Sequence, residues 1–174
     1  MEMGLIANSS AILELHANEC IWALAGVQQG LGACITSQIF NTANRFKALA
    51  ALMKLRRVDE PLIDEINKII ADFRDPSEKR NRALHDPWVV NREGGTGRVE
   101  VTANHKLVFE VREIPIEELN RDRLEIENFT RRFLLFRNKI FAALPTLPPI
   151  PELRLQPIHF VDLAHERSQS SGEK

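Results

Sequence analysis

The sequence predicts a mainly α-helical fold, an antiparallel bundle of four to five helices with a small β-hairpin or meander inserted before the last long helix. Apolar residues recur every three or four positions through most of residues 12–73 and 116–144, which is the spacing of amphipathic helices. Residues 88–114 instead alternate between apolar and polar side chains, as strands do. With 174 residues, 44% of them apolar, the chain is long enough for one domain with a hydrophobic core.

The first two predicted helices are separated by a glycine-rich segment. One of the polar residues Asn8, Ser9 or Ser10 can cap the first helix, which we expect to end near Gly30 and Gly32. A second pair of hydroxyl residues can cap the next helix, whose apolar stripe ends before the basic run KLRR, a composition that suits a helix C-terminus. The residues concerned in this second helix are Thr36 or Ser37, Ile39, Phe40 and Met53.

A third helix is predicted from Asp59, with Pro61 in its first turn, to Phe73. After this helix in the sequence, Asp75 is expected to cap a further short helix with Pro76 in its first turn. Pro87 is expected to end this helix because proline cannot continue the backbone hydrogen bonds.

The inserted strands are predicted at residues 88–90, 98–103 and 106–114, joined by a glycine-rich turn and by a turn at 104–105. After Pro115 a long helix is expected to close the bundle, running to Leu144 and stopping at Pro145. The sequence thus predicts one domain over residues 1–146 with the insertion at about 88–114. Residues 147–174 are rich in proline and then polar, which is typical of a partly disordered tail.

Charge and cysteine content limit the classes of function. The net charge is −1, so the whole chain is not a polyanion-binding surface, and any such site must be local. Cys20 and Cys34 lie in apolar helical patterns without the spacing of a redox or metal motif, which favours free buried thiols in the cytoplasm. The longest apolar run falls short of a membrane span, and we expect no membrane association.

The stretch DPSEKRNRALHDPWVV, residues 75–90, gathers basic side chains near a predicted helix start. Lys79, Arg80 and Arg82 surround Asn81, and His85 follows. Backbone N–H groups and the helix dipole favour an anion at such a position, and the three cations add to this effect. We therefore expect a local anion site with Lys79 and Arg82 among its phosphate contacts.

Arg80 and His85 suit the cleavage of a phosphodiester without a metal ion. Histidine exchanges a proton near neutral pH, and a guanidinium holds two phosphate oxygens with a fixed charge. Asn81 and His85 are one turn apart, whereas Arg80 lies about 140° from His85 around an ideal helix and must reach over with its long side chain. A solvated helix face is the alternative reading of the same residues.

The hexapeptide RNRALH, residues 80–85, resembles the Arg-Asn-x-x-x-His signature of HEPN domains (higher eukaryotes and prokaryotes nucleotide-binding). The order of elements over residues 9–144 is similar too, because long helices precede the motif and a long helix follows it. Many HEPN proteins are metal-independent endoribonucleases that act on RNA and whose active site forms where two motifs meet in a homodimer. Others are inactive partners or binding modules.

The resemblance implies a role for each residue of the motif. His85 would transfer a proton at the ribose 2′-hydroxyl or the leaving group, Arg80 would stabilise the charged phosphorane, and Asn81 would support them. It also implies a homodimer and, where a member acts as a toxin, a cognate antitoxin or another protein partner. Toxin-type members often carry a tyrosine two residues after the histidine, where this chain has Pro87. The alternative function is a non-catalytic HEPN-like module that binds nucleotide or protein, or that only dimerises.

No cofactor or metal ion is expected. His159 and His165, near Asp162 and Glu166, have the spacing of neither a helical pair nor a zinc motif. His16 is expected to be a structural residue of the first helix, and His105 to belong to a turn.

Overall fold

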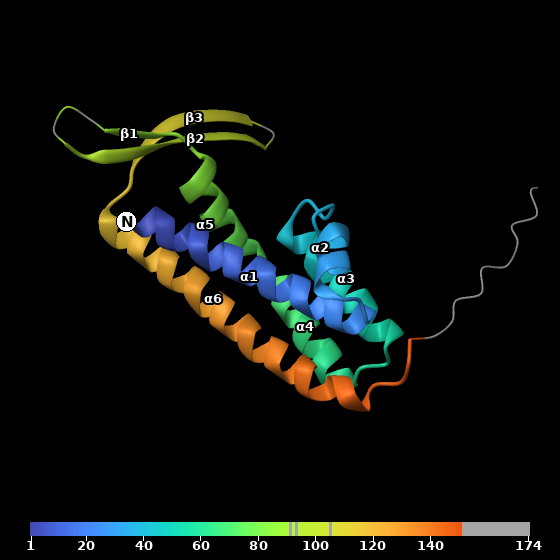
Figure 1. Ribbon diagram of the computed structural model, residues 1–174. Coiled ribbons are helices and arrows are strands. Elements are labelled where there is room, and N and C mark those ends of the chain that lie inside the picture. The colour runs from blue at the N-terminus through green and yellow to red at the C-terminus, as the bar shows by residue number, and fades with distance from the viewer. Residues whose placement is uncertain (91, 93, 105, 151–174) are drawn as a thin grey trace, which may run out of the picture.

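Six helices and one three-stranded antiparallel sheet form the computed structural model, which describes residues 1–90, 92, 94–104 and 106–150 (Figure 1). A 3-10 turn follows the last helix, at Leu144–Thr146. The predicted class, mainly helical with a β insertion before the last long helix, is confirmed. The elements are α1 (Glu2–Ala25), α2 (Gln29–Thr36), α3 (Thr42–Leu55), α4 (Glu60–Asp72), α5 (Arg74–His85), β1 (Trp88–Val90), β2 (Thr96–Asn104), β3 (Lys106–Glu113) and α6 (Ile116–Ala143).

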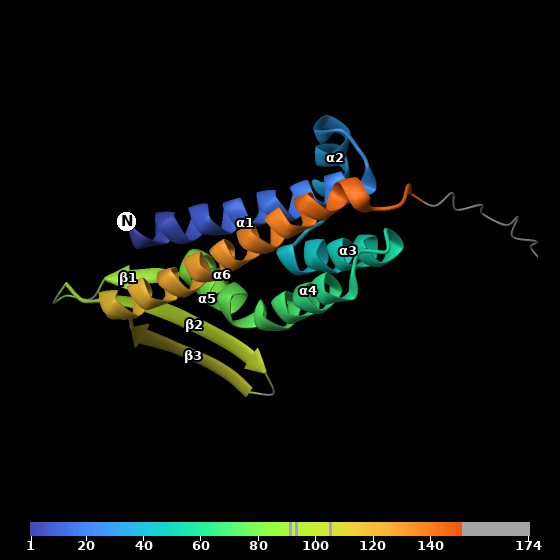
Figure 2. The ribbon, with the colours of Figure 1, turned by 90° about the horizontal axis from the view of Figure 1, so that it is seen from below.

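The two longest helices, α1 and α6, lie side by side and run in the same direction (Figures 1 and 2). Ion pairs join them along their length. Arg123 of α6 contacts Glu2 at the start of α1, and Arg137 contacts Glu19 farther along. These two helices form the frame against which the shorter elements pack.

Helices α4 and α5 run opposite to α6. Lys139 contacts Glu65 of α4, and Arg132, nearer the start of α6, contacts Asp72 at the end of α4. The junction at Phe73 keeps a helical backbone, with φ −71° and ψ −20°, so α5 continues α4 after a bend rather than starting afresh. Together they carry the chain along α6 toward the sheet.

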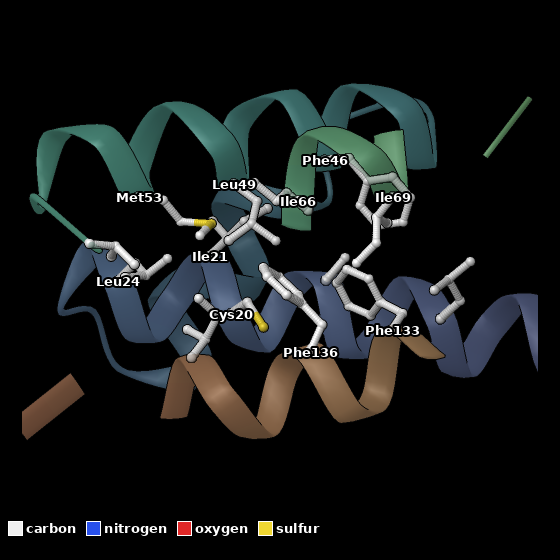
Figure 3. Packing of buried hydrophobic residues seen from close by; sticks show 14 of the residues in the cluster. Cys20, Ile21, Leu24, Phe46, Leu49, Met53, Ile66, Ile69, Phe133 and Phe136 are labelled. Atoms are coloured by element: carbon white, nitrogen blue, oxygen red, sulfur yellow. The ribbon is translucent and has the colours of Figure 1, made fainter. Parts of the chain in front are cut away.

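The main core lies between α1, α3, α4 and α6 (Figure 3). Phe46 of α3 is fully buried in it, with ring centroids of Phe73 and Phe133 each 5.0 Å away. Close aromatic pairs of this kind stabilise a core beyond the area that they bury. The fully buried side chains of this cluster include Leu24, Leu49, Met53, Ile66, Ile69, Phe136 and Ile140.

The first helix starts and ends earlier than predicted. It begins at Glu2, so the three expected cap residues lie inside it, and the hydroxyl of Ser10 donates to the carbonyl of Ile6, 2.9 Å away. Gly26 ends the helix in the left-handed conformation, φ 66°, which glycine adopts without steric cost. The sequence reasoning placed this end at the later glycines Gly30 and Gly32 instead.

The short helix α2 was not predicted. Thr36 does not cap the following helix, because its buried hydroxyl accepts a hydrogen bond from Trp22 and donates one to the carbonyl of Gly32. The cap of α3 is Asn41, whose side chain accepts from the backbone N–H of Asn44 at 2.8 Å. Phe40, predicted within the apolar stripe of this helix, lies just before it.

The predicted cap at Asp75 is also wrong. The side chain of Asp75 makes no capping hydrogen bond, and α5 already begins at Arg74. The helix has no separate start because the backbone at Phe73 stays helical, and the N–H of Ser77 donates to the carbonyl of Phe73. An anion site here must therefore depend on side chains rather than on a free helix N-terminus.

Of the two thiols predicted to be buried, Cys20 is buried, but Cys34 is exposed. Cys34 lies on α2, whose only buried residues are Gly32 and Thr36. The exposure follows from the break at Gly26, because α2 folds back as a separate turn and not as the end of a long core helix.

The sheet has the order β1-β2-β3 and projects beyond the helices at the α5 end of the molecule (Figure 1). Glu100 and Arg112 face the helices, where Arg82 of α5 and Glu118 of α6 contact them. Arg98, only 3% exposed, also contacts Glu100. The buried charges on this side of the sheet fix its position against α5.

Candidate functional site

The side chains of Arg80, Asn81 and His85 form one hydrogen-bonded cluster on α5. Nη1 of Arg80 donates to Oδ1 of Asn81 at 2.9 Å and lies 3.0 Å from Nε2 of His85. A guanidinium has donors only, so Nε2 of His85 accepts, and the proton of the neutral ring is on Nδ1. The structure thus brings together the three residues that the sequence singled out for catalysis.

The position of this cluster follows from the helix and its end. Arg80 and His85 are five residues apart and start on different sides of the helix, and the long Arg80 side chain spans the difference. His85 is the last residue of α5 because Asp86 has an extended backbone and Pro87 follows. The imidazole therefore stands where the helix ends and the sheet begins.

The cluster is open to solvent. Asn81 and His85 are exposed, and Arg80 is half-buried. Arg80 forms no ion pair within the part of the chain that the structure describes, so its charge is directed only at two neutral side chains. An accessible unneutralised guanidinium beside an imidazole can receive a phosphate.

Two adjoining clefts meet at the cluster. Arg80 and Asn81 line the first, of about 480 Å³. Asn81 and His85 line the second, of about 580 Å³. Both have Ala43, Lys47, Phe73, Ser77 and Asn81 in their walls. Volumes of a few hundred cubic ångströms suit a ligand of nucleotide size.

Two further cations face these clefts. Lys47 of α3 lines both, and Arg74 lines the second, and neither forms an ion pair with any of the described residues. The carboxylate of Glu14, in the first cleft, accepts from the hydroxyl of Thr42 at 2.8 Å and lies 3.9 Å from Arg45. In the second cleft the carboxylates of Glu78 and Asp86 contact Arg82. The charge that remains available in the clefts, from Lys47, Arg74 and Arg80, is positive, which favours an anionic ligand.

The structure does not bring Lys79 to the cluster. Its ammonium forms ion pairs with Glu125 and, at 3.3 Å, with Asp122, both on α6. Burial lowers the pKa of Lys79, but the hydrogen bond to Glu125 and the charge of Asp122 outweigh it, so the pKa is raised. The charge expected to contact phosphate is therefore balanced by two carboxylates.

Arg82 lies beside the second cleft, and carboxylates also surround it. It contacts Glu78 at 3.4 Å, Asp86 at 3.7 Å and Glu100 at 3.2 Å. The contact with Glu100 links α5 to the sheet. Of the two predicted phosphate contacts, only Arg82 shares a cleft with His85.

Sequence reasoning did not select Lys47, Arg74 or Phe40 for this site. Lys47 is far from the motif in the sequence and reaches it only because α3 packs beside the α4–α5 junction. Arg74 directly precedes the quoted stretch. Phe40 was expected in the core, yet 95% of it is exposed, and it lines the first cleft.

The remaining candidate residues do not add a second centre. His16 pairs with Glu19, 3.0 Å away, which agrees with a structural role, and His105, His159 and His165 lie outside the described residues. Within the described ranges no group of three His, Cys, Asp or Glu side chains is placed to hold a metal ion. No helix among the described residues is long and apolar enough to cross a membrane.

We compared the chain with models of known protein families, with curated proteins and with solved structures, and none of these comparisons gave a match.

Proposed function

We propose that this protein is a metal-independent endoribonuclease that cleaves single-stranded RNA, with Arg80, Asn81 and His85 as its catalytic residues. The observation that carries the proposal is the contact of 3.0 Å between Arg80 and His85 at the meeting point of two open clefts. The resemblance of residues 80–85 to the HEPN signature supports the same function.

The contact suggests how a substrate would activate the site. A bound phosphate attracts the Arg80 guanidinium, because a charge-assisted hydrogen bond to phosphate is stronger than one to a neutral imidazole. Nε2 of His85 then loses its donor and is free to accept the proton of the ribose 2′-hydroxyl. The 2′-oxygen attacks the phosphorus, the bond to the 5′-oxygen breaks, and a 2′,3′-cyclic phosphate remains. Arg80 stabilises the charge of the phosphorane.

The leaving 5′-oxygen also needs a proton, and one copy of the chain supplies one His85. In the proposed enzyme two copies face each other, so that the partner subunit's His85, protonated on both ring nitrogens, acts as the acid and gives one proton to the leaving oxygen. Sedimentation equilibrium is then expected to give a dimer, twice the chain mass of 19.8 kDa. The second cleft, which His85 lines, leaves this side of α5 accessible to a second copy.

The test is cleavage of a mixed single-stranded RNA pool in the presence of EDTA. The wild-type protein should produce fragments ending in 2′,3′-cyclic phosphate, and His85→Ala should not. His16→Ala is the matched control, because it removes an imidazole that lines neither cleft, and its cleavage should match that of wild type once folding is verified by circular dichroism. Equal cleavage by wild type and His85→Ala, or no cleavage by either, contradicts the proposal.

A second candidate is a non-catalytic module that binds nucleotide or a protein partner such as an antitoxin. The strands β2 and β3 favour a protein partner, since four large apolar side chains on them are 54–71% exposed, one of which, Val101, also lines the second cleft. Exposed patches of this kind are typical of interaction surfaces. Absence of cleavage by the wild-type protein, together with retained RNA or protein binding, would support this candidate. The four residues are Val101, Leu107, Phe109 and Val111.

A further inference from the structure

Phe40 is the least buried phenylalanine that the structure describes. It stands between the end of α2 and Asn41, the cap of α3, and 95% of its surface is exposed. A solvent-exposed ring lacks the favourable free energy of transfer from water that an aromatic side chain gains on burial. The other rings near this cleft, Phe73 and Phe129, are half-buried and buried.

The exposed ring lies on the same cleft as the catalytic guanidinium. Phe40 and Arg80 both line the first cleft, together with Lys47. Leu13, Phe73 and Phe129 give this cleft an apolar part. A ligand that fits it must therefore offer an anionic group and a flat apolar face.

We propose that Phe40 forms a stacking platform for one base of single-stranded RNA whose neighbouring phosphate lies between Arg80 and Lys47. This inference rests on the proposed function for its substrate. Aromatic side chains beside a cationic groove are the usual means by which proteins hold single strands without reading their sequence. Unpaired bases offer the face that such a ring needs, which bases inside a duplex do not.

The side chain of Asn44 adds a polar contact to this base site. It is exposed in the first turn of α3, lines the same cleft, and makes no side-chain hydrogen bond with the residues that the structure describes. An amide both donates and accepts, so it can pair with an edge of any base. We expect the stacking site to bind all four bases with similar affinity.

The charge of the cleft favours a polyanion over a protein at this ring. Lys47 and Arg80 have no carboxylate partner within the described ranges, whereas Glu14 is already held by Thr42 and Arg45. A protein segment that covered Phe40 would have to supply acidic groups to both cations. A nucleic acid supplies them with each phosphate.

The experiment measures RNA affinity without chemistry. In the His85→Ala protein with EDTA present, fluorescence anisotropy of a short labelled single-stranded RNA gives the dissociation constant. Phe40→Ala should weaken binding roughly 5- to 150-fold, the range expected for the loss of one stacked base. Phe40→Trp should bind at least as tightly as the parent, and Phe40→Leu, which keeps an apolar side chain without a ring, should lose most of the affinity.

Two controls separate stacking from other effects. A strand of the same length that lacks its bases should bind weakly. Its dissociation constant should be the same for the His85→Ala protein with and without Phe40→Ala. Leu31→Ala removes another exposed apolar side chain, 59% exposed on α2, and should leave the affinity unchanged. The midpoint of thermal unfolding should stay unchanged in each variant, since the altered side chains are exposed.

Unchanged RNA affinity in Phe40→Ala would overturn the inference, and so would an equal loss for the base-free strand. A change in sedimentation mass without a change in RNA affinity would identify the ring as a protein contact instead, which also overturns it. Failure of the stacking site is distinguishable from failure of the proposed enzyme. The affinity is measured in a protein that lacks His85, and the cleavage test uses the native Phe40.

Discussion

Nη1 of Arg80 lies 3.0 Å from Nε2 of His85, so the cation and the proton acceptor of the proposed reaction satisfy each other in the free protein. This arrangement holds the imidazole in one tautomer and orientation, with Asn81 fixing the guanidinium from its other side. In the proposed reaction, a phosphate that binds the guanidinium would release this acceptor. Substrate binding and base activation would then be coupled through one hydrogen bond.

Replacing Arg80 should reduce cleavage without affecting the fold. We expect Arg80→Ala to lower the rate of RNA cleavage about 10²- to 10³-fold, the typical loss for one transition-state donor. Arg80→Lys should recover only part of it, because an ammonium keeps the charge but not the planar pair of donors. Initial rates with EDTA measure the effect. A rate for Arg80→Ala within a few-fold of wild type, with an unchanged melting temperature, would contradict the role.

Lys47 and Lys79 form a matched pair that tests which charges face RNA. Lys47→Ala should weaken binding of single-stranded RNA and reduce the slope of log affinity against log salt by about 0.7, the value for one phosphate contact. Lys79→Ala should leave both quantities unchanged, because Glu125 and Asp122 already neutralise this charge. Affinities measured over a series of salt concentrations decide between the two lysines. Equal slopes for the two variants would contradict the assignment.

Lys79→Ala should instead affect stability, with a pH dependence of known sign. The pKa of Lys79 is raised in the folded protein, so its ion pairs contribute fully below its ordinary pKa of 10.5. The contribution is lost as the pH rises through the higher folded value. The free energy of unfolding of Lys79→Ala should therefore lie below that of wild type at neutral pH and approach it only in strong alkali.

Features that depend on residues close together in the sequence were easier to predict than contacts between helices. The spacing placed Asn81 and His85 one turn apart on one helix, whereas Arg80 lies about 140° from His85 around an ideal helix and meets it only through its long side chain. The β insertion followed equally from alternation and turn residues. These features depend on neighbours in the sequence.

The predictions that were wrong concern residues whose role depends on tertiary contacts. Thr36 was predicted as a helix cap, but its hydroxyl accepts a hydrogen bond from Trp22, a residue of a different helix. Lys79 looked like a phosphate ligand until α6 placed two carboxylates beside it. Lys47 joined the site only because α3 packs against α4, beside its junction with α5. Neither the hydrophobic periodicity nor the spacing of nearby residues shows which helices pack against one another.

Glu100 is expected to hold the sheet against α5. It contacts Arg98 at 2.5 Å, Arg82 at 3.2 Å and Arg112 at 3.6 Å. Among the described residues, Glu100→Gln leaves the buried Arg98 with Asp86 as its one acidic partner, at 3.6 Å. We expect a loss of about 1–3 kcal/mol in the free energy of unfolding at neutral pH, the usual effect of weakening a buried charged hydrogen bond.

The same substitution should remove part of the acid sensitivity of the protein. Burial raises the pKa of Glu100, but the hydrogen bond from Arg98 and the charges of Arg98, Arg82 and Arg112 outweigh it, so the pKa is lowered. Its contribution is therefore present above the ordinary value of 4.5 and lost as the pH falls through the folded value. Urea denaturation should show wild type and Glu100→Gln converging in acid.

Glu110 provides the control for this prediction. It lies opposite Glu100 in the β2–β3 register, but it is exposed and forms no ion pair with the residues that the structure describes. Glu110→Gln should change the free energy of unfolding by less than about 0.5 kcal/mol at any pH. A difference between wild type and Glu100→Gln that does not shrink in acid would rule out the charge of Glu100 as its cause.

The two thiols should differ in reactivity because of where their helices place them. Cys20 is fully buried in the core, and burial raises the pKa of its thiol to about 12, whereas Cys34 is exposed on α2. Only a thiolate attacks an aromatic disulfide reagent, and only an accessible one can do so. The native protein should therefore release one equivalent of chromophore per chain, and the protein in denaturant two. Cys34→Ser should release none until it unfolds. Rapid reaction of both thiols in the native wild-type protein would mean that the contact of α1 with α3 opens, and would contradict the described core.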